Sequence, residues 1–469
     1  MNYKKISKLI LLNKEQKWWR NYPPSIYIHR KKISTKTVKF YLEKVFNKQN
    51  ANKIGLYIHI PFCRYRCNFC RYYSKINWDK NTMSEYVKSI EKELFLYKID
   101  FKKHSLQSIY FGGGTPTLLY KENWIELFKI INKFFKIEQN AQILVEATPE
   151  TCTFSKLKLL KDLGVNRLTI GAQTFDEKIL NSLNRRHSIA DIYKAFKNAR
   201  KAGIKYLNMD LLFGLPGETK KSFLDTLKCA AEIKANCISP AFLDLNERVV
   251  YSKEDFKNTY INAGRKEKDM EAEAFSEMQR FFKKKGYVNE INGVRYTSFL
   301  LQGETSAFNK NILPKGSFDS AFAIGCHANS YINYFEKRPY QLQYQGVKLE
   351  HYISSVKNGR LPYFSGTELL EDEIIRQYII YCFIFFHEKI NKEDFLKWFN
   401  KDIMSFLKTN SPKLLKDNKV REDKNFVYFF RKKPYVRTNR DKFLFFCIKY
   451  LYSPKVLKIL EKEAKDKIS

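Results

Sequence analysis

The stretch Tyr57-Ile-His-Ile-Pro-Phe-Cys63-Arg-Tyr-Arg-Cys67-Asn-Phe-Cys70 decides the fold of this chain. Its first residues are apolar, aromatic and β-branched, which is typical of a buried strand. Its second half is polar and carries three cysteines, separated by three and then two residues. The pattern predicts a strand that ends in a loop where three thiols converge.

The spacing of these cysteines indicates an iron–sulfur cluster. A cubane [4Fe–4S] cluster has four irons, so Cys63, Cys67 and Cys70 would bind three of them and leave the fourth open to a chelating ligand. A structural zinc ion is the alternative, but no second cysteine pair or nearby His-x3-5-His motif completes its tetrahedral ligand set. His59 could be that fourth ligand, although it falls within the expected strand. Three unrelated buried cysteines fit the spacing less well.

Beyond this stretch, short apolar runs alternate with longer stretches of helical period, which predicts βαβ units and a parallel sheet, an α/β fold. Six strands are expected, at Ile54–Ile60, Leu106–Phe111, Gln142–Ala147, Arg167–Ala172, Leu207–Phe213 and Ile238–Leu245. Helices are expected at Ser84–Tyr97, Glu122–Phe135, Ser155–Leu163, Ile189–Ala202, Lys221–Ala235 and Lys268–Lys285. Glycines late in or just after strands place the functional mouth at the strands' carboxyl ends; they are Gly112-Gly113-Gly114, Gly171 and Gly214.

The 469 residues allow two or three domains. Residues 1–50 precede the first strand and are expected to pack as a lid or collar. Residues 51–344 would hold the barrel and its extension. Residues 345–469 show mainly helical patterns and are expected to form a C-terminal accessory domain, small and mixed or winged-helix-like.

The formal net charge of +36 would ordinarily favour a nucleic acid or an anionic membrane as partner. The excess is nearly all lysine, spread along the chain with many Asn and Ile residues, so we expect neither partner and retain only a bias towards anionic small substrates. Nine cysteines without a signal-peptide pattern indicate a reducing compartment, the cytoplasm. The most apolar run, Tyr378–Phe386, is shorter than the ~20 residues that span a bilayer, so a buried helix is expected.

Several segments, taken in order, resemble the radical S-adenosylmethionine superfamily, and in particular the subfamily of oxygen-independent coproporphyrinogen III oxidase and its relatives. The segments are Tyr57–Cys63, Phe111–Thr117, Val145–Glu150, Arg167–Phe175, Leu183–His187 and Asp210–Gly217, with weaker likeness at Ile324–Tyr331 and Gly359–Pro362. The resemblance implies a partial (β/α)6 barrel with an N-terminal extension and a mainly helical C-terminal domain. It also implies S-adenosylmethionine on the open iron of a [4Fe–4S] cluster.

The same resemblance implies which residues bind S-adenosylmethionine. The glycine loop, including Gly113 and Gly114, would hold the amino group of the cofactor. Glu146 would contact the cofactor and Asp210 its ribose hydroxyls, although each carboxylate could also be a helix cap. Catalytic residues in the strict sense are not identified.

Further cofactor contacts are expected from five other side chains. Arg185 suits the methionyl carboxylate, although it could be a solvated cation, and Gln173 offers an amide. Phe69, between two of the cysteines, can pack on adenine. Tyr57 and Thr115 complete the expected cofactor-binding set.

The chemistry that the resemblance implies is one-electron reduction of the sulfonium, which releases a 5′-deoxyadenosyl radical. The electron would come from a flavodoxin or ferredoxin-type donor. Coproporphyrinogen oxidases usually carry a fourth cysteine two residues after the third, but here Arg71 and Tyr72 follow Cys70. That departure weakens the oxidase assignment.

The segment Cys67–Trp78 resembles instead the anaerobic haem-utilisation relatives, methyltransferases that open haem. Class C methyl transfer on a tetrapyrrole is therefore the leading hypothesis, and oxidative decarboxylation of coproporphyrinogen III is the alternative. Some relatives act as haem chaperones without catalysis, which is a third reading. Cys326 and His327 could supply a haem ligand or a substrate contact, or form a buried structural pair.

Overall fold

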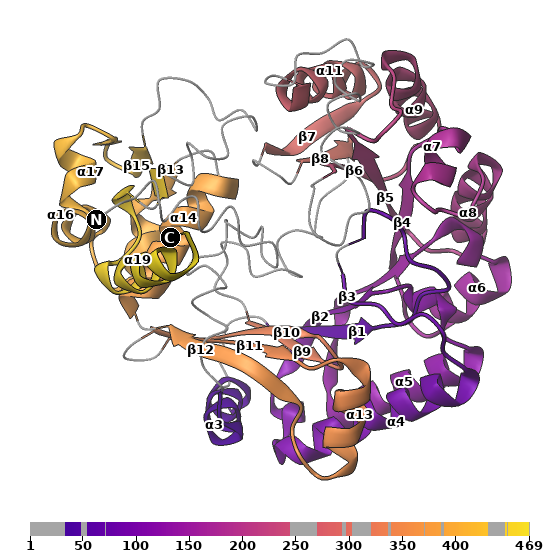
Figure 1. The fold of residues 1–469 in the computed structure, drawn as a ribbon, viewed down its shortest axis with the longest axis horizontal. Helices are drawn as coiled ribbons and strands as arrows, with labels where there is room; N and C mark the ends of the chain where they lie inside the picture. Colours follow the sequence, from indigo (N-terminus) through magenta and orange to yellow (C-terminus); the bar gives the residue numbers. More distant parts are fainter. Residues whose placement is uncertain are drawn as a thin grey trace.

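The computed structural model describes residues 33–47, 54–70, 72–243, 270–292, 297–302, 320–335, 339–369, 371–385, 389–429, 446–447 and 449–468. These residues form one large curved sheet, covered by helices on its outer side, and a smaller C-terminal unit (Figure 1). Most of the predicted lid, residues 1–32, lies outside the described residues, as does Arg71.

Six parallel strands form the centre of the large sheet and follow one another in chain order. They are β1 (Ile54–Ile60), β2 (Ser105–Gly113), β3 (Lys136–Ala147), β4 (Arg167–Gln173), β5 (Tyr206–Phe213) and β6 (Cys237–Phe242). All six predicted strands are confirmed, although residues 244 and 245 of the last one lie outside the described ranges. Strands β1 and β4 are buried along almost their whole length on both faces, as a parallel sheet requires, whereas the first half of β3 is largely exposed.

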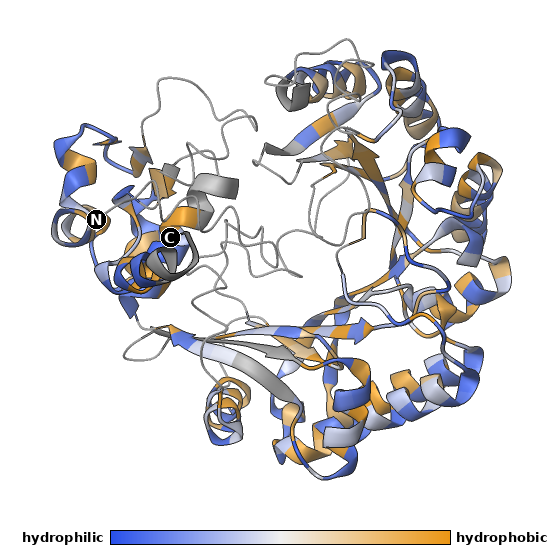
Figure 2. Cartoon of the chain, viewed as in Figure 1, coloured by the Kyte–Doolittle hydropathy of each residue, from blue (hydrophilic) through white to orange (hydrophobic). Residues whose placement is uncertain are grey.

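Helices connect these strands and line the outer side of the curved sheet (Figure 1). They are α4 (Lys80–Tyr97), α5 (Lys121–Phe134), α6 (Phe154–Asp162), α7 (Glu177–Ser182), α8 (Ile189–Lys201) and α9 (Lys220–Glu232). The predicted stripe on α4 is confirmed, because Tyr86, Val87, Ile90, Leu94 and Tyr97 are all buried. Figure 2 shows the corresponding apolar colouring along the strands and on one side of the helices.

Capping side chains mark the starts of three of these helices. The Asp79 side chain accepts a hydrogen bond from the Thr82 amide and so begins α4. Ser188 and Asp191 form a reciprocal capping box at the start of α8. Helix α7, which the sequence analysis missed, begins where Asp176 accepts from two amides of its first turn.

Further strands extend the sheet at both edges. On one side are β9 (Ser320–Ile324), β10 (Asn329–Phe335), β11 (Pro339–Gly346) and β12 (Tyr363–Leu369); on the other are β8 (Thr297–Leu301) and β7 (Tyr287–Asn292), preceded by α11 (Met270–Lys284). Strand β9 pairs parallel to β1, whereas the other added strands pair antiparallel. Strand β1 is therefore an interior strand with a neighbour on each side.

The large sheet and the C-terminal unit have separate hydrophobic cores. The first core includes α3 (Thr35–Phe46) and α13 (Leu349–Lys357). The second begins at Leu369 and gathers α14 (Glu371–Phe385), α15 (Lys392–Phe399), α16 (Ile403–Asn410), α17 (Pro412–Lys416), α19 (Pro454–Ile468) and the small sheet of β13 (Lys389–Asn391), β14 (Val420–Glu422) and β15 (Phe426–Phe429). Helix α13 thus packs in the first core and β12 pairs with β11 of the large sheet, both beyond the expected boundary at residue 345. The division at 1–50, 51–344 and 345–469 stays a prediction.

The apolar run that begins at Tyr378 lies in α14, whose residues Ile374, Ile375 and Ile379 are fully buried in the second core. Across the part of the chain that the structure describes, no helix is both long and apolar enough to cross a membrane.

A buried carboxyl group joins three segments of the first core. Glu93 of α4 is only 2% exposed, and its Oε2 accepts hydrogen bonds from the Gly325 amide (2.9 Å) and the Tyr352 hydroxyl (2.7 Å). Its Oε1 accepts from the Tyr97 hydroxyl (3.1 Å). Helix α4, the turn after β9 and helix α13 therefore meet at one carboxylate.

Stability should depend on pH through Glu93. Burial raises its pKa from 4.5 to about 7, and the three hydrogen bonds oppose that rise only in part. Because the folded chain binds this proton more tightly than the unfolded chain, the free energy of unfolding falls as pH rises from about 4.5 to about 7, by at most about 3 kcal/mol. Glu93→Gln should flatten this dependence, as read from urea-unfolding midpoints between about pH 5 and pH 8.

Glu91→Gln is the matched control, since Glu91 lies on the same helix and pairs with Lys133 at the surface (2.8 Å). It should leave the pH dependence unchanged. An equal flattening in both variants would contradict the assignment to Glu93.

Candidate active site

The three cysteines lie in the loop that follows β1, and both ends of this loop are fixed by hydrogen bonds. The Cys63 amide donates to the Lys75 carbonyl (3.0 Å), and the Lys75 amide donates to the Pro61 carbonyl (2.6 Å). The Trp78 indole nitrogen donates to the Cys63 carbonyl (2.8 Å). The segment that follows Cys70 therefore folds back and holds the first cysteine in place.

The far half of the loop is docked on the end of α7. The Asn68 amide donates to the Leu183 carbonyl (3.0 Å), and its side chain donates to the Ser182 carbonyl (2.8 Å). Asn184, in the left-handed region at φ +54°, donates from its side chain to the Arg66 carbonyl (2.7 Å). Helix α7 and the turn after it thus position the cysteine loop from the opposite side.

The three thiols are half-buried, and none forms a disulfide. Burial raises the pKa of the Cys63 and Cys70 thiols, and the neighbouring Cys67 thiol contributes to both rises; the pKa of Cys70 reaches about 12. These thiols are therefore close enough to repel as thiolates and need a cationic centre to ionise together. Among the described residues, no group of three or more His, Cys, Asp or Glu is arranged to hold a single metal ion.

The end of β2 lies directly against the start of the cysteine loop. The Gly114 amide donates to the Ile60 carbonyl (2.8 Å), and the Thr115 amide donates to the Phe62 carbonyl (2.8 Å). The Thr115 hydroxyl lies 3.6 Å from the Cys63 sulfur. A Cβ at Gly114 would lie 2.6 Å from the Phe62 carbonyl oxygen, so only glycine allows this approach.

Glu146, at the end of β3, faces the same edge. Its Oε2 accepts from the Gly113 amide (3.2 Å), and its Oε1 accepts from the Tyr110 hydroxyl. Burial nevertheless raises the pKa of this carboxyl group. The Tyr57 ring lies beside it, and both would be within 3.2 Å of a Cβ at Gly112. The site therefore holds a carboxylate that can accept from a ligand amine.

Asp210, on β5, is the second carboxyl group at this mouth. Burial and, to a smaller extent, the charge of Glu146 raise its pKa to about 7, although a hydrogen bond from the Asn208 side chain (2.8 Å) opposes the rise. Two carboxylates that repel each other in a buried site favour a ligand that brings positive charge and hydroxyl donors. The predicted Glu146 and Asp210 are thus brought together.

Arg185 connects the mouth to the cysteine loop. Its guanidinium is buried and donates through Nη2 to the Gly171 carbonyl (2.7 Å) and through Nη1 to the Cys67 sulfur (3.5 Å). Its Nε is buried with no hydrogen-bond partner. Gln173 ends β4 at φ +70°, with its amide nitrogen 2.6 Å from where a Gly171 Cβ would stand. Both residues thus lie beside Gly171, and their cofactor contacts remain predictions.

Phe69 takes a different environment from the one expected. Its ring is partly buried and packs against a small apolar cluster of Ile179, Leu183, Leu215 and Leu243. Phe69 therefore contributes to the docking of the cysteine loop on α7. A contact with adenine remains a prediction.

Three residues that the sequence analysis did not single out form a polar cluster behind the loop. The Tyr65 hydroxyl donates to Glu150 Oε1 (2.6 Å), and His187 Nδ1 lies 3.6 Å from Glu150 Oε2. His187 Nε2 lies 3.3 Å from the Ala172 carbonyl oxygen, and burial lowers the His187 pKa to about 4. Glu150 and His187 end two of the segments that carry the family resemblance, which was the available signal.

Cys326 and His327, for which the sequence left a haem ligand, a substrate contact and a buried structural pair as alternatives, have different environments. Cys326 is completely buried, and its amide donates to the Tyr86 hydroxyl (3.2 Å). Burial raises the pKa of its thiol. The His327 ring is half-buried and stacks on Tyr73, with 5.0 Å between ring centroids. Cys326 therefore fits a structural role. The His327 ring instead packs against the rings of Tyr73 and His59, next to the site.

His59 lies next to that stacked pair. Its Nδ1 is 3.1 Å from the Tyr57 hydroxyl, and its Nε2 is 3.1 Å from the Tyr73 carbonyl oxygen. Burial and, to a smaller extent, the nearby His327 lower its pKa to about 4. Both ring nitrogens are thus occupied within the protein.

Comparisons with known proteins agree with this architecture. The family model of the radical SAM superfamily matches residues 57–230. The heme chaperone HemW of Bacillus subtilis is 30% identical over 328 residues, which cover 68% of this chain and 80% of that protein. The oxygen-independent coproporphyrinogen III oxidase of Escherichia coli is 32% identical over 186 residues, 40% of this chain and 41% of the oxidase.

Among solved structures, the Escherichia coli coproporphyrinogen III oxidase HemN superposes with a TM-score of 0.73 at 21% identity, covering 92% of this chain and 97% of that one. Fold and site together define a radical SAM protein, with the α/β barrel expected from the sequence. This membership implies a [4Fe–4S] cluster and S-adenosylmethionine, and the three repelling thiols beside a buried guanidinium fit such a cluster. Within the superfamily, the chain belongs to the HemN/HemW family.

Proposed function

We propose that this protein reductively cleaves S-adenosylmethionine and uses the radical so formed on a tetrapyrrole, with methyl transfer as the outcome. The observation that carries the first part is the convergence of the cysteine loop, Glu146, Asp210 and Arg185 on one mouth. When bound, the cluster supplies the electron that breaks a carbon–sulfur bond of the sulfonium. The protein residues then have to bind and orient the nucleoside.

The polar groups at the mouth match a zwitterionic nucleoside. The Glu146 carboxylate would accept from the methionyl amine, beside the glycine edge of Gly113 and Gly114. The Asp210 carboxylate would accept from the ribose hydroxyls, which offsets its repulsion by Glu146. The Nε of Arg185, which is buried without a partner, would donate to the methionyl carboxylate while Nη1 stays on Cys67.

A tetrapyrrole substrate is supported by the relatives, whose names refer to heme and to coproporphyrinogen. Methyl transfer is favoured because Arg71 and Tyr72 follow Cys70, where oxidases usually carry another cysteine. Trp78, at the end of the segment that resembles the haem-utilisation methyltransferases, donates to the Cys63 carbonyl. That segment is therefore part of the site. A flavodoxin or ferredoxin-type protein would donate the electron, in the reducing cytoplasm.

Oxidative decarboxylation of coproporphyrinogen III is the second candidate. The specific observation in its favour is the fold likeness to HemN, which extends over nearly the whole of both chains. A third outcome, haem transfer without catalysis, follows from the name of the Bacillus relative.

The test is an anaerobic reaction of the reconstituted protein with dithionite and S-adenosylmethionine deuterated in its methyl group. Haem and coproporphyrinogen III are offered separately, and 5′-deoxyadenosine and products are identified by mass spectrometry. Deuterated methyl in the product, with loss of the porphyrin absorption band, supports methyl transfer and ring opening. Loss of carboxyl mass from coproporphyrinogen supports the oxidase instead.

Absence of 5′-deoxyadenosine with every substrate, together with intact transfer of haem to an apoprotein acceptor, would overturn the catalytic proposal.

Asp210→Asn is an informative variant for the cofactor site. It keeps the shape of Asp210 but removes the charge that faces Glu146, so S-adenosylmethionine should bind roughly 10-fold more weakly, as measured by equilibrium dialysis.

A further inference from the structure

We propose that the outer side of the cysteine loop is the docking surface for an acidic one-electron carrier protein, an inference that rests on the proposed radical function. The surface consists of Arg64, Arg66 and Arg186, which we call the arginine face. Each cleavage of S-adenosylmethionine consumes one electron, so a carrier has to approach the cluster. The arginine face is where the loop meets solvent.

The two sides of the loop differ in what they contact. On the inner side, Cys67 accepts from Arg185 (3.5 Å) and Cys63 lies 3.6 Å from the Thr115 hydroxyl. Arg64 and Arg66 both lie between Cys63 and Cys67, and both side chains are exposed. The cysteines thus face the barrel while these two cations face solvent.

Arg186 reaches the same side from a distant part of the chain. Its guanidinium lies 5.3 Å from the centroid of the Tyr65 ring, and Arg186 is exposed. Tyr65 is anchored by its hydrogen bond to Glu150 (2.6 Å), and the Arg66 carbonyl is held by Asn184 (2.7 Å). The three cations therefore stand on a framework that hydrogen bonds hold fixed.

The chemistry of the arginine face favours carboxylates. Lysine is by far the commoner basic residue of this chain, yet all three positions are arginine. A guanidinium binds carboxylates in a bidentate manner, which fixes the orientation of a partner better than an ammonium does. Glu177 is an exposed acidic residue on nearby α7, and its carboxylate accepts a hydrogen bond from the Ile189 amide (2.7 Å). An acidic partner seated here would place its redox group directly over the cluster ligands.

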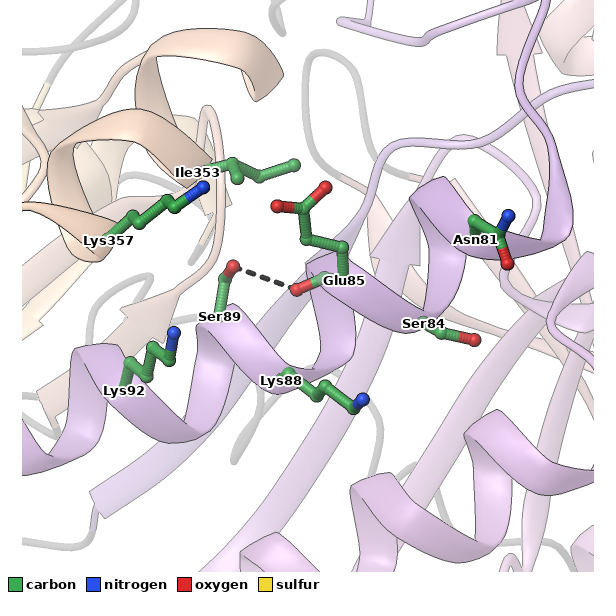
Figure 3. A pocket seen from close by; sticks show the side chains of 8 residues that line it. All are labelled: Asn81, Ser84, Glu85, Lys88, Ser89, Lys92, Ile353 and Lys357. Carbon is green, nitrogen blue, oxygen red and sulfur yellow. Dashed lines mark hydrogen bonds between the residues drawn. The ribbon is translucent and has the colours of Figure 1, made fainter.

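A second basic surface provides the matched control. Lys88, Lys92 and Lys357 line a groove of about 380 Å³ between α4 and α13 (Figure 3). Glu85 extends into the same groove, and no cysteine lines it. The groove has a similar number of cations but lies on the helical layer, away from the loop.

The experiment compares three reconstituted proteins under anaerobic conditions: the unmodified chain, Arg64→Glu/Arg66→Glu, and the control Lys88→Glu/Lys92→Glu. Each is mixed with photoreduced flavodoxin, and the rate of cluster reduction is followed by the loss of visible absorbance. The arginine variant should be slower by roughly 10- to 100-fold at low salt, whereas the control should change by less than about 2-fold. Dithionite, a small reductant, should reduce all three at the same rate.

Two further readings make the result decisive. Raising the salt from about 0.05 to 0.5 M should slow reduction of the unmodified chain by flavodoxin, whereas it should not slow reduction of the charge-reversed variant, so the two rates should converge. Arg64→Lys/Arg66→Lys should restore part of the rate. Equal rates of reduction by flavodoxin in the arginine variant and the control would overturn the docking proposal. Because this readout does not require cleavage of S-adenosylmethionine, it is separate from a failure of the proposed function, which appears as no 5′-deoxyadenosine with dithionite.

Discussion

Replacement of Cys67 by alanine is expected to abolish the bound cluster and with it all formation of 5′-deoxyadenosine. Cys67 is the central cysteine of the loop, and its sulfur is the one to which Arg185 donates. A cubane held by two protein thiolates would leave two irons open to water and to loss. The same loss is expected for Cys63→Ala and Cys70→Ala.

The measurements are iron and sulfide content after reconstitution and the visible absorbance of the cluster. Cys229→Ala is the matched control, because Cys229 is also half-buried but lies on α9, away from the loop. It should retain the full cluster. A complete cluster in any of the three loop variants would contradict the ligand assignment.

Replacement of Gly114 by alanine should have the second largest effect. Its Cβ would lie 2.6 Å from the Phe62 carbonyl oxygen and 3.0 Å from that of Ile60. Both oxygens belong to backbone and accept hydrogen bonds from this same turn, so no side chain can move to relieve the clash. The cost should be roughly 3 kcal/mol, from overpacking and two weakened hydrogen bonds.

The variant should therefore unfold about 5 to 10 °C lower and bind substoichiometric iron, as measured by calorimetry and iron analysis. Gly359→Ala is the control variant, because it adds a Cβ at a glycine with positive φ but without a steric clash. A Cβ at Gly359 meets nothing within 4 Å, although φ is +69°, so the cost should be about 1 kcal/mol and the cluster should be complete. Equal losses of iron in the two variants would show that the close approach at Gly114 is unimportant.

The sequence predicted the parts of the fold that are encoded locally. The six barrel strands and the stripe on α4 follow from apolar periodicity over a few residues, and the structure has them where they were expected. Helix α7 was missed because its six residues are too short to show a helical period. The pairing of β9 with β1 was also missed, because it joins residues far apart in the chain and no local pattern records that contact.

The candidate site shows the same division. Glu146 and Asp210 were chosen from motifs, and the structure places both at one mouth, where the charge of Glu146 raises the pKa of Asp210. The contact between Tyr65 and Glu150 could not be predicted, since it depends on how the cysteine loop folds across the sheet. The surroundings of Phe69 likewise depend on tertiary packing.

The position of β1 between β2 and β9 has a consequence for biosynthesis. At translation rates of roughly 5–20 residues per second, β9 leaves the ribosome about 13–50 s after β1. During that interval the cysteine loop follows a strand that is paired on one side only. Glu93 also lacks the hydrogen bonds from the Gly325 amide and the Tyr352 hydroxyl. We therefore expect metal insertion to follow the emergence of β9 and α13, which the iron content of nascent chains stalled before and after these elements would reveal. Recombinant yield of the loaded protein should then depend on the host's capacity to deliver iron and sulfide to chains in which β1 has already paired with β9.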